Sequence, residues 1–477
     1  MIKKELIFCL FWMSFSFFAN GQEIKVTPEI FLQSNTNYEI IGNVDNVPMI
    51  LLQRGSELTI NAYDKNMRSK WERELNFERR SSKIVGIVAN KKTFSIFYKY
   101  KTKGRVHLRM REYDNKLKLV DSTLVKLYPK ENYSPNPMMY LSKNKSKLLF
   151  LHASDDTKLT AIVFDNKNKK VIRDFGFSPR NFSYLEDFLD ALVDNEGGIH
   201  LVSSKDNNKS KKETNRLEII SFLPDTDNFL YYSASFGGRI WYDLELNYDN
   251  INKKILVGGY YSEKSVSEAH GVFYMNIDPR EPINLVSNYQ EFDLTYLKLI
   301  LGKEVKKNVG FRAVVVQQLI PRRDGGILMI AERRKKVTRN LNGYTPGMGN
   351  SGQVSVQTDY YYNEILLCSF NPDGSVHWKE ILHKKQYSQD DKAEFSSFFL
   401  FLNKRNLRFL YNDRVKKGDT VYEYKVNGLG GADRKSLFNT KKYKFMLKLS
   451  SALQISGNEV IVPSERRSQL QLVRLTF

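Results

Sequence analysis

The sequence predicts an all-β fold, a β-propeller of eight four-stranded blades. One unit recurs about every 57 residues: an apolar strand, a short polar turn, a second apolar strand, a polar loop and an alternating third strand. The last unit stops after its third strand, and an unassigned extended segment stands near the N-terminus. Aromatic residues make up 13% of the chain, which suits blades that pack face to face. Repeated four-stranded units of this length are typical of propellers.

The clearest unit spans residues 311–382 and reads as four strands with two tight turns. These turns lie at residues 324–326 (DGG) and 371–374 (NPDG). Asp-Gly between two apolar runs is a strong hairpin signal, because glycine supplies the positive φ that such turns require. A single unit of this kind cannot cover its own apolar faces, so it requires similar neighbours along the chain.

The turn after the first strand recurs in every unit. The eight turns are expected at residues 44–47, 89–92, 143–146, 194–198, 248–250, 323–326, 403–406 and 456–458. Six of the eight third strands end at or beside an aspartate. The carboxylates of Asp64, Asp114, Asp165, Asp278 and Asp373 are expected to cap the turn that follows. An aspartate in most repeats differs from the single carboxylate pair of a glycosidase.

The outer strand that the last unit lacks is expected from the other end of the chain. Residues 23–33 (EIKVTPEIFLQ) are extended, and Pro28 is tolerable there only at a sheet edge. Pairing this segment with the last unit closes the ring and leaves no open edge. Seven blades is the alternative, if the unit at residue 194 or at residue 403 is not a blade. One helix, a surface crossover at residues 293–304, is expected between the fifth and sixth units.

Residues 1–21 are expected to be a secretory signal peptide, and residues 22–477 a single propeller domain. A positively charged start and a short apolar run precede the small residues at 19–21 (ANG). No later run is long and apolar enough to span a membrane. We therefore expect an exported protein, periplasmic or associated with the outer membrane, with an extracellular location as the alternative. Cys368 would be its single cysteine, buried in the core rather than reactive.

The net charge of +21 predicts an acidic partner, either an acidic protein or an anionic glycan. Export argues against nucleic acid as that partner. Because the strands of a blade alternate in direction, the loop between second and third strands lies on the same face as the connections between blades. Five of these loops are basic and would form one basic rim. The residues expected to bind are Lys101, Lys103, Lys209, Lys211, Lys212, Arg333, Arg334, Lys335, Lys336, Arg339, Tyr344, Arg414, Lys416, Lys417, Arg466 and Arg467.

The alternative interpretation of the rim is that charged loops only keep the surface solvated. The longest of these loops is expected from Arg333 to Tyr360, where several glycines make it flexible and Tyr344 could dock on a partner. Its GMGNSG sequence lacks the Lys-Ser/Thr pair and the helix that a phosphate-binding loop requires.

No catalytic, cofactor-binding or metal-binding residue is predicted. His152 and His200 are expected at equivalent ends of second strands, and none of the histidines has the spacing of metal ligands. The sequence contains no Gly-x-Ser-x-Gly elbow and no His-Glu-x-x-His motif. Enzymatic activity therefore has no motif to support it, and a non-catalytic role is favoured.

Two segments, residues 62–75 (AYDKNMRSKWEREL) and 369–382 (SFNPDGSVHWKEIL), carry a resemblance to a known repeat. They resemble the repeat of quinoprotein-like β-propellers, in which an Asp, a Gly and a Trp punctuate the outer strands. Periplasmic propellers of outer-membrane assembly share this form. The resemblance implies an eight-bladed fold and an envelope location. It does not extend to a quinone cofactor, whose ligands have no counterpart here, and Trp241 stands on an inner strand outside the pattern.

Three functions are compatible with these observations. The first is a non-catalytic, exported interaction scaffold of the cell envelope that binds an acidic protein or glycan through the basic rim. The second is a carbohydrate-active enzyme, a lyase or hydrolase, that acts on anionic polysaccharide. The third is a subunit of an outer-membrane secretion or assembly machine.

Overall fold

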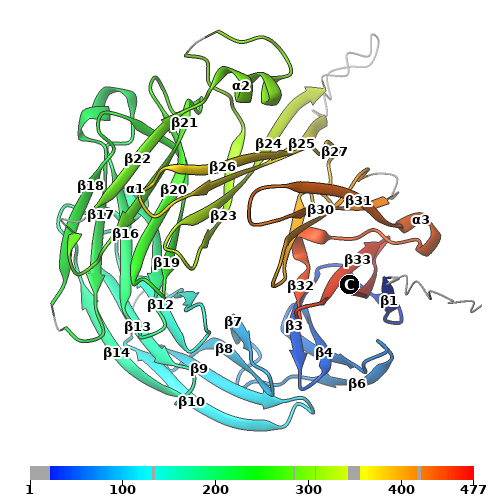
Figure 1. Ribbon diagram of the computed structural model, residues 1–477. Helices are drawn as coiled ribbons and strands as arrows, with labels where there is room; N and C mark the ends of the chain where they lie inside the picture. Colours follow the sequence, from blue (N-terminus) through cyan, green and yellow to red (C-terminus); the bar gives the residue numbers. More distant parts are fainter. Residues whose placement is uncertain are drawn as a thin grey trace, which may run out of the picture.

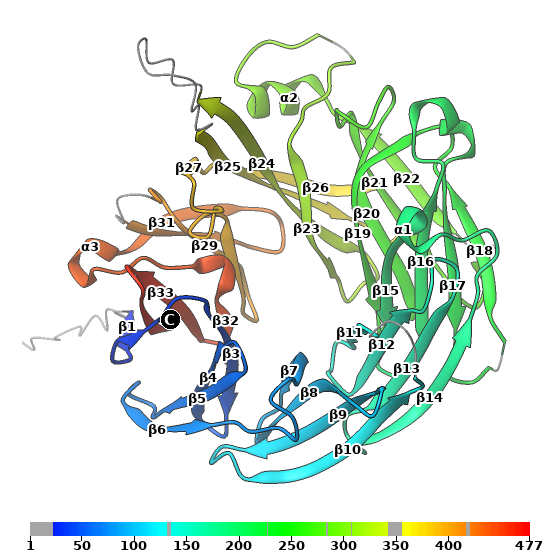
Figure 2. The ribbon, with the colours of Figure 1, turned by 180° about the vertical axis from the view of Figure 1, so that it is seen from behind.

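The computed structural model describes residues 22–130, 135–226, 228–282, 285–306, 308–341, 355–415 and 420–477. Within these ranges the strands form eight antiparallel sheets that follow one another around a ring (Figure 1 and Figure 2). The predicted eight-bladed propeller is confirmed, and the seven-bladed alternative is wrong. The predicted signal peptide, residues 1–21, lies outside the described ranges.

Blades 1 to 4 are built in chain order, from the inner strand to the outer strand. Blade 1 holds β3 (Thr36–Val44), β4 (Val47–Arg54), β5 (Glu57–Tyr63) and β6 (Ser69–Glu74). Blade 2 holds β7 (Lys83–Ala89), β8 (Thr93–Thr102), β9 (Arg105–Asp114) and β10 (Leu119–Tyr128). Blade 3 holds β11 (Met138–Leu141), β12 (Lys147–Ala153), β13 (Leu159–Asp165) and β14 (Lys170–Phe177). Blade 4 holds β15 (Phe188–Val193), β16 (Ile199–Lys205), β17 (Arg216–Phe222) and β18 (Leu230–Ser235).

Blades 5 to 7 keep the same order, and blade 8 takes strands from both ends of the chain. Blade 5 holds β19 (Ile240–Asp249), β20 (Lys254–Ser262), β21 (Gly271–Ile277) and β22 (Val286–Glu291). Blade 6 holds β23 (Val314–Pro321), β24 (Ile327–Leu341), β25 (Ser355–Phe370) and β26 (Val376–Leu382), with β27 (Gln386–Gln389) paired to β25. Blade 7 holds β28 (Phe398–Leu402), β29 (Leu407–Asn412), β30 (Thr420–Val426) and β31 (Ala432–Asn439). Blade 8 holds β32 (Leu453–Gln454), β33 (Glu459–Arg466), β34 (Gln469–Thr476) and β1 (Glu23–Val26), with β2 (Ile30–Phe31) also on β34.

The N-terminal strand closes the ring as predicted. β1 pairs antiparallel with β34, from Glu23 opposite Thr476 to Val26 opposite Val473. Between β1 and β2 the backbone N–H of Thr27 still donates to the Leu472 carbonyl (3.1 Å). The N-terminal strand therefore supplies the outer strand of blade 8 and joins the two ends of the described chain in one sheet.

Apolar side chains fill the space between each pair of neighbouring blades. The described residues form eight buried clusters, and each joins residues of two adjacent blades, including blades 8 and 1. Cys368 lies in the cluster between blades 5 and 6 and is 2% exposed. Burial raises the pKa of its thiol to about 12, so it serves as a core residue, as expected.

The described helices are short and lie between strands. They are α1 (Tyr184–Asp187), η1 (Lys209–Thr214), α2 (Leu294–Leu301), α3 (Thr440–Tyr443) and η3 (Leu449–Ser451). α2 is the helix expected at residues 293–304. It begins where the Asp293 carboxylate accepts from the Tyr296 backbone N–H, and it ends at Gly302, whose φ of 68° favours glycine. Its buried side chains include Leu297 and Ile300, which pack beside blades 5 and 6.

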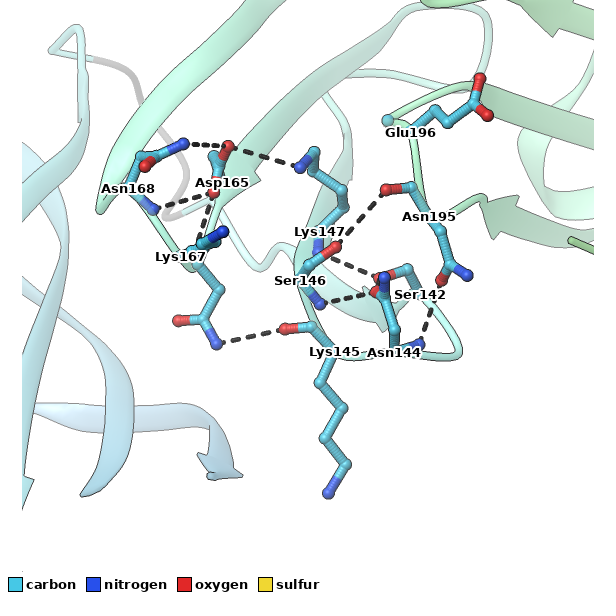
Figure 3. Close-up of polar contacts among 12 residues, drawn as sticks. Ser142, Asn144, Lys145, Ser146, Lys147, Asp165, Lys167, Asn168, Asn195 and Glu196 are labelled. Carbon is cyan, nitrogen blue, oxygen red and sulfur yellow. Dashed lines mark hydrogen bonds and ion pairs between the residues drawn. The ribbon is translucent and has the colours of Figure 1, made fainter. Parts of the chain in front are cut away.

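The predicted turn chemistry is confirmed at the ends of the third strands. Asp165 Oδ1 accepts from the backbone N–H groups of Lys167 and Asn168 (2.9 Å each), and Lys147 Nζ donates to its Oδ2 (3.3 Å) (Figure 3). Gly325 and Gly374 occupy the two tight turns of blade 6 with φ of 89° and 82°. A side chain at either position would be strained, which explains the glycine in both turns.

The two faces of the ring carry different connections. The turn face carries the first-to-second and third-to-fourth turns, and its turns are bonded across blades (Figure 3). The Asn144 backbone N–H donates to Asn195 Oδ1 (3.1 Å), and Ser146 Oγ donates to the Asn195 carbonyl (3.4 Å). The Asn195 backbone N–H donates in turn to Asn250 Oδ1 (2.7 Å). These bonds tie blades 3, 4 and 5 together at the turn face.

The opposite face, here called the loop face, carries the second-to-third loops and the connections between blades. One prediction about it is wrong. Arg333 to Tyr360 is not one long loop, because β24 and β25 stay paired as far as Leu341 opposite Ser355. β27 adds a third strand to the pair at residues 359–362. The paired segments 333–341 and 355–362, here called the blade 6 arm, contain β-branched and aromatic residues that favour strand (Figure 1). Tyr344 lies outside the described residues.

Candidate functional site

The structure places the predicted rim residues on the loop face. Lys101 and Lys103 lie at the β8–β9 loop, and Arg466 and Arg467 at the β33–β34 loop. Lys209, Lys211 and Lys212 lie on η1 between β16 and β17, Arg333 to Lys336 and Arg339 on the blade 6 arm, and Arg414 after β29. Lys416 and Lys417 lie outside the described residues, as does Tyr344. These positions share one face, but the cations differ in whether a carboxylate neutralises them.

The highest density of cations without a paired carboxylate is found at blade 2. Arg79 and Arg80 lie in the connection before it, Lys83 starts its inner strand, and Lys130 follows its outer strand. The blade 2 basic cluster is defined as Arg79, Arg80, Lys83, Lys99, Lys101, Lys103, Arg105 and Lys130. All are exposed except Lys99, which is half-buried, and across the described ranges none of the eight forms an ion pair. Their charges are therefore available to a partner.

Local contacts join these residues into one surface. Lys83 and Lys99 stand opposite each other on β7 and β8, and Lys99 Nζ donates to the Pro135 carbonyl (2.6 Å). Burial, together with the charge of Lys83, lowers the pKa of Lys99. The side chain of Lys130 packs beside Gly104 at the tip of the loop. An anion bound here would relieve the repulsion among these like charges.

Glu78, in the connection to blade 2, does not neutralise this cluster. Its carboxylate is held by Arg111 (2.8 Å) and Arg109 (3.8 Å), and it also accepts from the Tyr98 hydroxyl (2.7 Å). Those two arginines lie further along β9 and are outside the cluster.

The arginines of the blade 6 arm are, in contrast, paired inside the protein. Arg333 pairs with Glu364 (3.0 Å), Arg334 with Glu332 (2.6 Å), and Arg339 with Asp359 (2.5 Å). Glu332 and Asp359 are buried, at 0% and 1% exposure. Much of the charge predicted here from sequence therefore serves the fold. Lys335 and Lys336 form no ion pair within the described residues.

The remaining rim residues lie between the blade 2 basic cluster and the blade 6 arm in how far carboxylates neutralise them. Lys211 pairs with Asp206 (3.1 Å), whereas the exposed Arg466 and Arg467 have no ion pair in the described part of the chain. Arg414 is exposed as well. The loop face is thus unevenly basic, with its strongest region at blade 2.

Hollows open among the loops and blade connections of this face, and five of those lined by described residues measure about 840, 760, 690, 590 and 270 Å³. Rim residues line four of them. Lys211 lines the hollow of about 840 Å³, and Arg333 and Lys335 line that of about 760 Å³. Arg334 lines the hollow of about 690 Å³, and Arg466 and Arg467 line that of about 590 Å³. Cavities of several hundred Å³ are the usual size of ligand sites, so the loop face offers both charge and concavity.

Inner strands carry a second group of titratable residues, the carboxyls of Asp190, Asp243 and Glu245. Burial raises the pKa of Asp243 to about 6. Burial, with the negative charges of Asp190 and Asp243, raises the pKa of Glu245 to about 7. No group of three or more His, Cys, Asp or Glu side chains within the described ranges is arranged to hold a metal ion.

The histidine expectation is wrong. His152 is near the end of β12, toward the loop face, whereas His200 is near the start of β16, toward the turn face. His200 is fully buried, with Nδ1 2.8 Å from Ser221 Oγ.

The residues expected to bind did not include six members of the blade 2 basic cluster: Arg79, Arg80, Lys83, Lys99, Arg105 and Lys130. The sequence did contain a signal for them, because blade connections lie on the same face as the second-to-third loops. Charge in those connections, counted together with charge in the loops, would have singled out blade 2.

No family model matches the chain, and no curated protein sequence matches it. Solved structures with a similar fold include the polysaccharide lyase Uly1, at 8% identity and TM-score 0.41, covering 82% of this chain and 89% of that one. A europium-containing methanol dehydrogenase is 10% identical at TM-score 0.39, covering 95% and 93%. The β-propeller domain of the Trilobed protease from Pyrococcus furiosus is 13% identical at TM-score 0.37, covering 86% and 98%. The eight-bladed form that the resemblance to quinoprotein-like propellers implied is confirmed by the eight sheets of the structure itself.

Among the described residues, no helix combines the length and apolarity needed to cross a membrane.

Proposed function

We propose that this protein is a non-catalytic, exported propeller that binds an acidic partner, an acidic protein or an anionic glycan, through its loop face. One observation carries the proposal: eight cations gather at blade 2 without a carboxylate to pair with them among the described residues. Keeping like charges together costs stability, so a fold that retains them on one surface suits a polyanionic partner. Electrostatic complementarity of this kind steers association and selects partners by charge.

A binding experiment with two matched variants tests the proposal. The first variant replaces three cluster residues, Lys101→Gln, Lys103→Gln and Arg105→Gln. The control replaces three exposed cations on the turn face of the same blade, Lys91→Gln, Lys92→Gln and Lys116→Gln. Both remove three positive charges, so any difference reports position. The probes are polygalacturonate and poly-glutamate, titrated into the mature chain at a series of salt concentrations.

We expect the cluster variant to bind at least one probe roughly tenfold more weakly at low salt, with a flatter salt dependence. The control should bind within about twofold of the natural chain. Equal losses in both variants, or no binding of either polyanion by the natural chain, would overturn the proposal. Preference for one probe distinguishes a glycan from an acidic protein.

Export to the cell envelope is part of the proposal and has its own test. It is supported by the charged start and apolar run of residues 1–21. We expect the purified native protein to begin at Gln22 and to appear in the periplasmic or outer-membrane fraction. Recovery of the uncleaved chain from the cytoplasm would contradict export. Stoichiometric co-purification with an outer-membrane complex would favour the role of a machine subunit.

The inner-strand carboxyls favour a second candidate function, cleavage of an anionic polysaccharide. Glu245, with its pKa raised to about 7 by burial and by neighbouring carboxylates, could hold a proton for a leaving group at neutral pH. Release of reducing or unsaturated ends from uronate polymers, abolished by Glu245→Gln, would establish this activity. No release across a panel of anionic polysaccharides would leave binding as the function.

A further inference from the structure

The hollow of about 690 Å³ on the loop face combines features that the proposed function does not use. It lies between inner strand β3 of blade 1, the blade 6 arm, and the connections that lead into β28 and β32. We propose that it binds a sugar acid, one or two rings with a carboxylate and free hydroxyls, as a unit of an anionic glycan. This inference rests on the proposed function, since it names the chemistry of the acidic partner.

One wall of the hollow presents an oriented arginine. Arg334 Nε donates to Glu332 (2.6 Å), its Nη2 donates to Ser397 Oγ (2.9 Å), and its guanidinium lies over the Tyr362 ring at 5.0 Å. Its Nη1 group has no hydrogen-bond partner among the described residues, and the side chain is 27% exposed. A guanidinium fixed by other contacts, with free N–H groups at a cavity, is suited to a carboxylate.

The charges behind this wall sum to a positive value. Lys384 and Glu332 are both fully buried, with Lys384 Nζ 2.5 Å from Glu332 Oε1. Ser397 Oγ also donates to Glu332 (2.7 Å), so both carboxylate oxygens are occupied inside the protein. One carboxylate thus stands between two cations, Lys384 and Arg334. The excess positive charge is at Arg334, the exposed end of the trio, and a bound anion would balance it.

Another part of the lining, around Lys448, presents acceptors for hydroxyl groups. Lys448 Nζ lies 2.7 Å from Glu394 and 2.6 Å from Glu465, and the Tyr38 hydroxyl donates to Glu465 (3.1 Å). Glu394 remains 44% exposed, so lone pairs on its carboxylate stay open to the hollow. Glu39 also lines the hollow. A ligand with an anionic end at Arg334 and a hydroxyl-rich body at these carboxylates matches both groups of residues.

The backbone that borders the hollow is held in unfavourable conformations. Asp390, Lys392, Ala393 and Ser397 have φ of 54°, 54°, 58° and 71°, in a region that non-glycine residues seldom adopt. Three of the four, Lys392, Ala393 and Ser397, line the hollow. Strain of this kind persists where the surrounding structure enforces it and concentrates at binding sites. Here it places Ser397 against Arg334.

Titration calorimetry with the mature chain tests the inference. The probe is trigalacturonate, and its fully methyl-esterified form has the same rings without the charges. Arg334→Gln removes the guanidinium and leaves Glu332 paired with Lys384, so the fold should persist. Ser451→Tyr, at an exposed position in the hollow's lining, fills the site without touching that ion pair. Arg333→Gln is the control, because it removes an arginine one residue away that lines a different hollow.

We expect the natural chain to bind trigalacturonate and not its ester. Arg334→Gln and Ser451→Tyr should each weaken binding by about tenfold or more, while Arg333→Gln stays within about twofold. Equal binding of the ester, unchanged affinity in Arg334→Gln, or no binding by the natural chain would overturn the inference. Tighter, Arg334-dependent binding of a zwitterionic tripeptide would overturn it in favour of a peptide ligand. If the natural chain does not bind trigalacturonate but the blade 2 variant still loses polyanion binding, this inference is overturned and the proposed function stands.

Discussion

Blade 2 and blade 6 carry basic segments at the same place in the repeat, yet the structure uses their charges differently. At blade 2 eight cations stand together, and none is paired with a carboxylate in the described part of the chain. At blade 6 the arm's arginines each meet an acidic partner, two of which are buried. A run of Lys and Arg in sequence is therefore ambiguous until its carboxylates are found. Arg333 and Arg339, which are paired, serve the fold, and the unpaired cations of blade 2 are available to a polyanion.

The largest effect should follow from breaking the buried trio at blade 6. Glu332→Ala leaves Lys384 buried without its counter-charge and Arg334 without its anchor, so we expect a loss of about 3–5 kcal/mol in the free energy of unfolding. Denaturant unfolding measures it. Glu57→Ala, which removes an exposed pair with Arg54 (3.7 Å), is the control and should cost less than about 1 kcal/mol. Similar losses in both variants would remove the distinction between buried and exposed pairs.

A smaller effect should come from the inner-strand carboxyls, which are half-buried and have no paired cation among the described residues. Asp243 and Glu245 have pKa values raised to about 6 and about 7, whereas unfolded carboxyls ionise near pH 4. Between these values the folded chain holds protons that the unfolded chain has released, so stability falls as pH rises. The stability that the protonated Asp243 and Glu245 contribute is fully present below about pH 4. It is lost as the pH rises through about 6 to 7.

Because these side chains are only partly buried, we expect the loss to total about 1–2 kcal/mol by pH 8. The variant with Asp243→Asn and Glu245→Gln should show a flatter profile of unfolding free energy against pH. Its difference from the natural chain isolates these two groups from all others that titrate. Parallel profiles for the two proteins would contradict the assignment.

The smallest effect on stability should come from blade 2. Replacing Lys101, Lys103 and Arg105 with Gln removes exposed charges that make no ion pair among the described residues. We expect the unfolding free energy to change by less than about 0.5 kcal/mol, with any shift toward greater stability because repulsion falls. A thermal melt at low salt measures it. Marked destabilisation would show that these cations hold the fold after all.

Much of the fold could be predicted from the sequence because its signals are local and repeated. Turn glycines such as Gly325 and Gly374 and turn-capping aspartates such as Asp165 recur with apolar alternation in successive units. Closure of the ring by residues 23–33 could be predicted because the last unit of the sequence lacks its fourth strand, and β1 takes that place. The sequence could not show that the arm beyond Arg333 continues as paired strands. That pairing depends on β27, which returns to β25 from outside the repeat.

The candidate site was harder to predict because ion pairing is not local. Arg334 is neutralised by Glu332, two residues away on the same strand, but the trio also needs Lys384 from beyond the fourth strand. The cluster at blade 2 draws Arg79 and Lys130 from connections on either side of the blade. Only the assembled ring shows which cations meet a carboxylate.

The central claim is that the unpaired cations of the blade 2 basic cluster attract the polyanionic partner, whereas Arg333 and Arg339, which are paired inside the protein, do not. The most direct measurement compares polygalacturonate affinity, as a function of salt, for two double variants. One is Lys101→Gln with Lys103→Gln, and the other is Arg333→Gln with Arg339→Gln. Both lower the net charge by two. We expect the blade 2 variant to lose affinity and salt dependence while the blade 6 variant keeps both; the reverse order, or equal losses, would contradict the account.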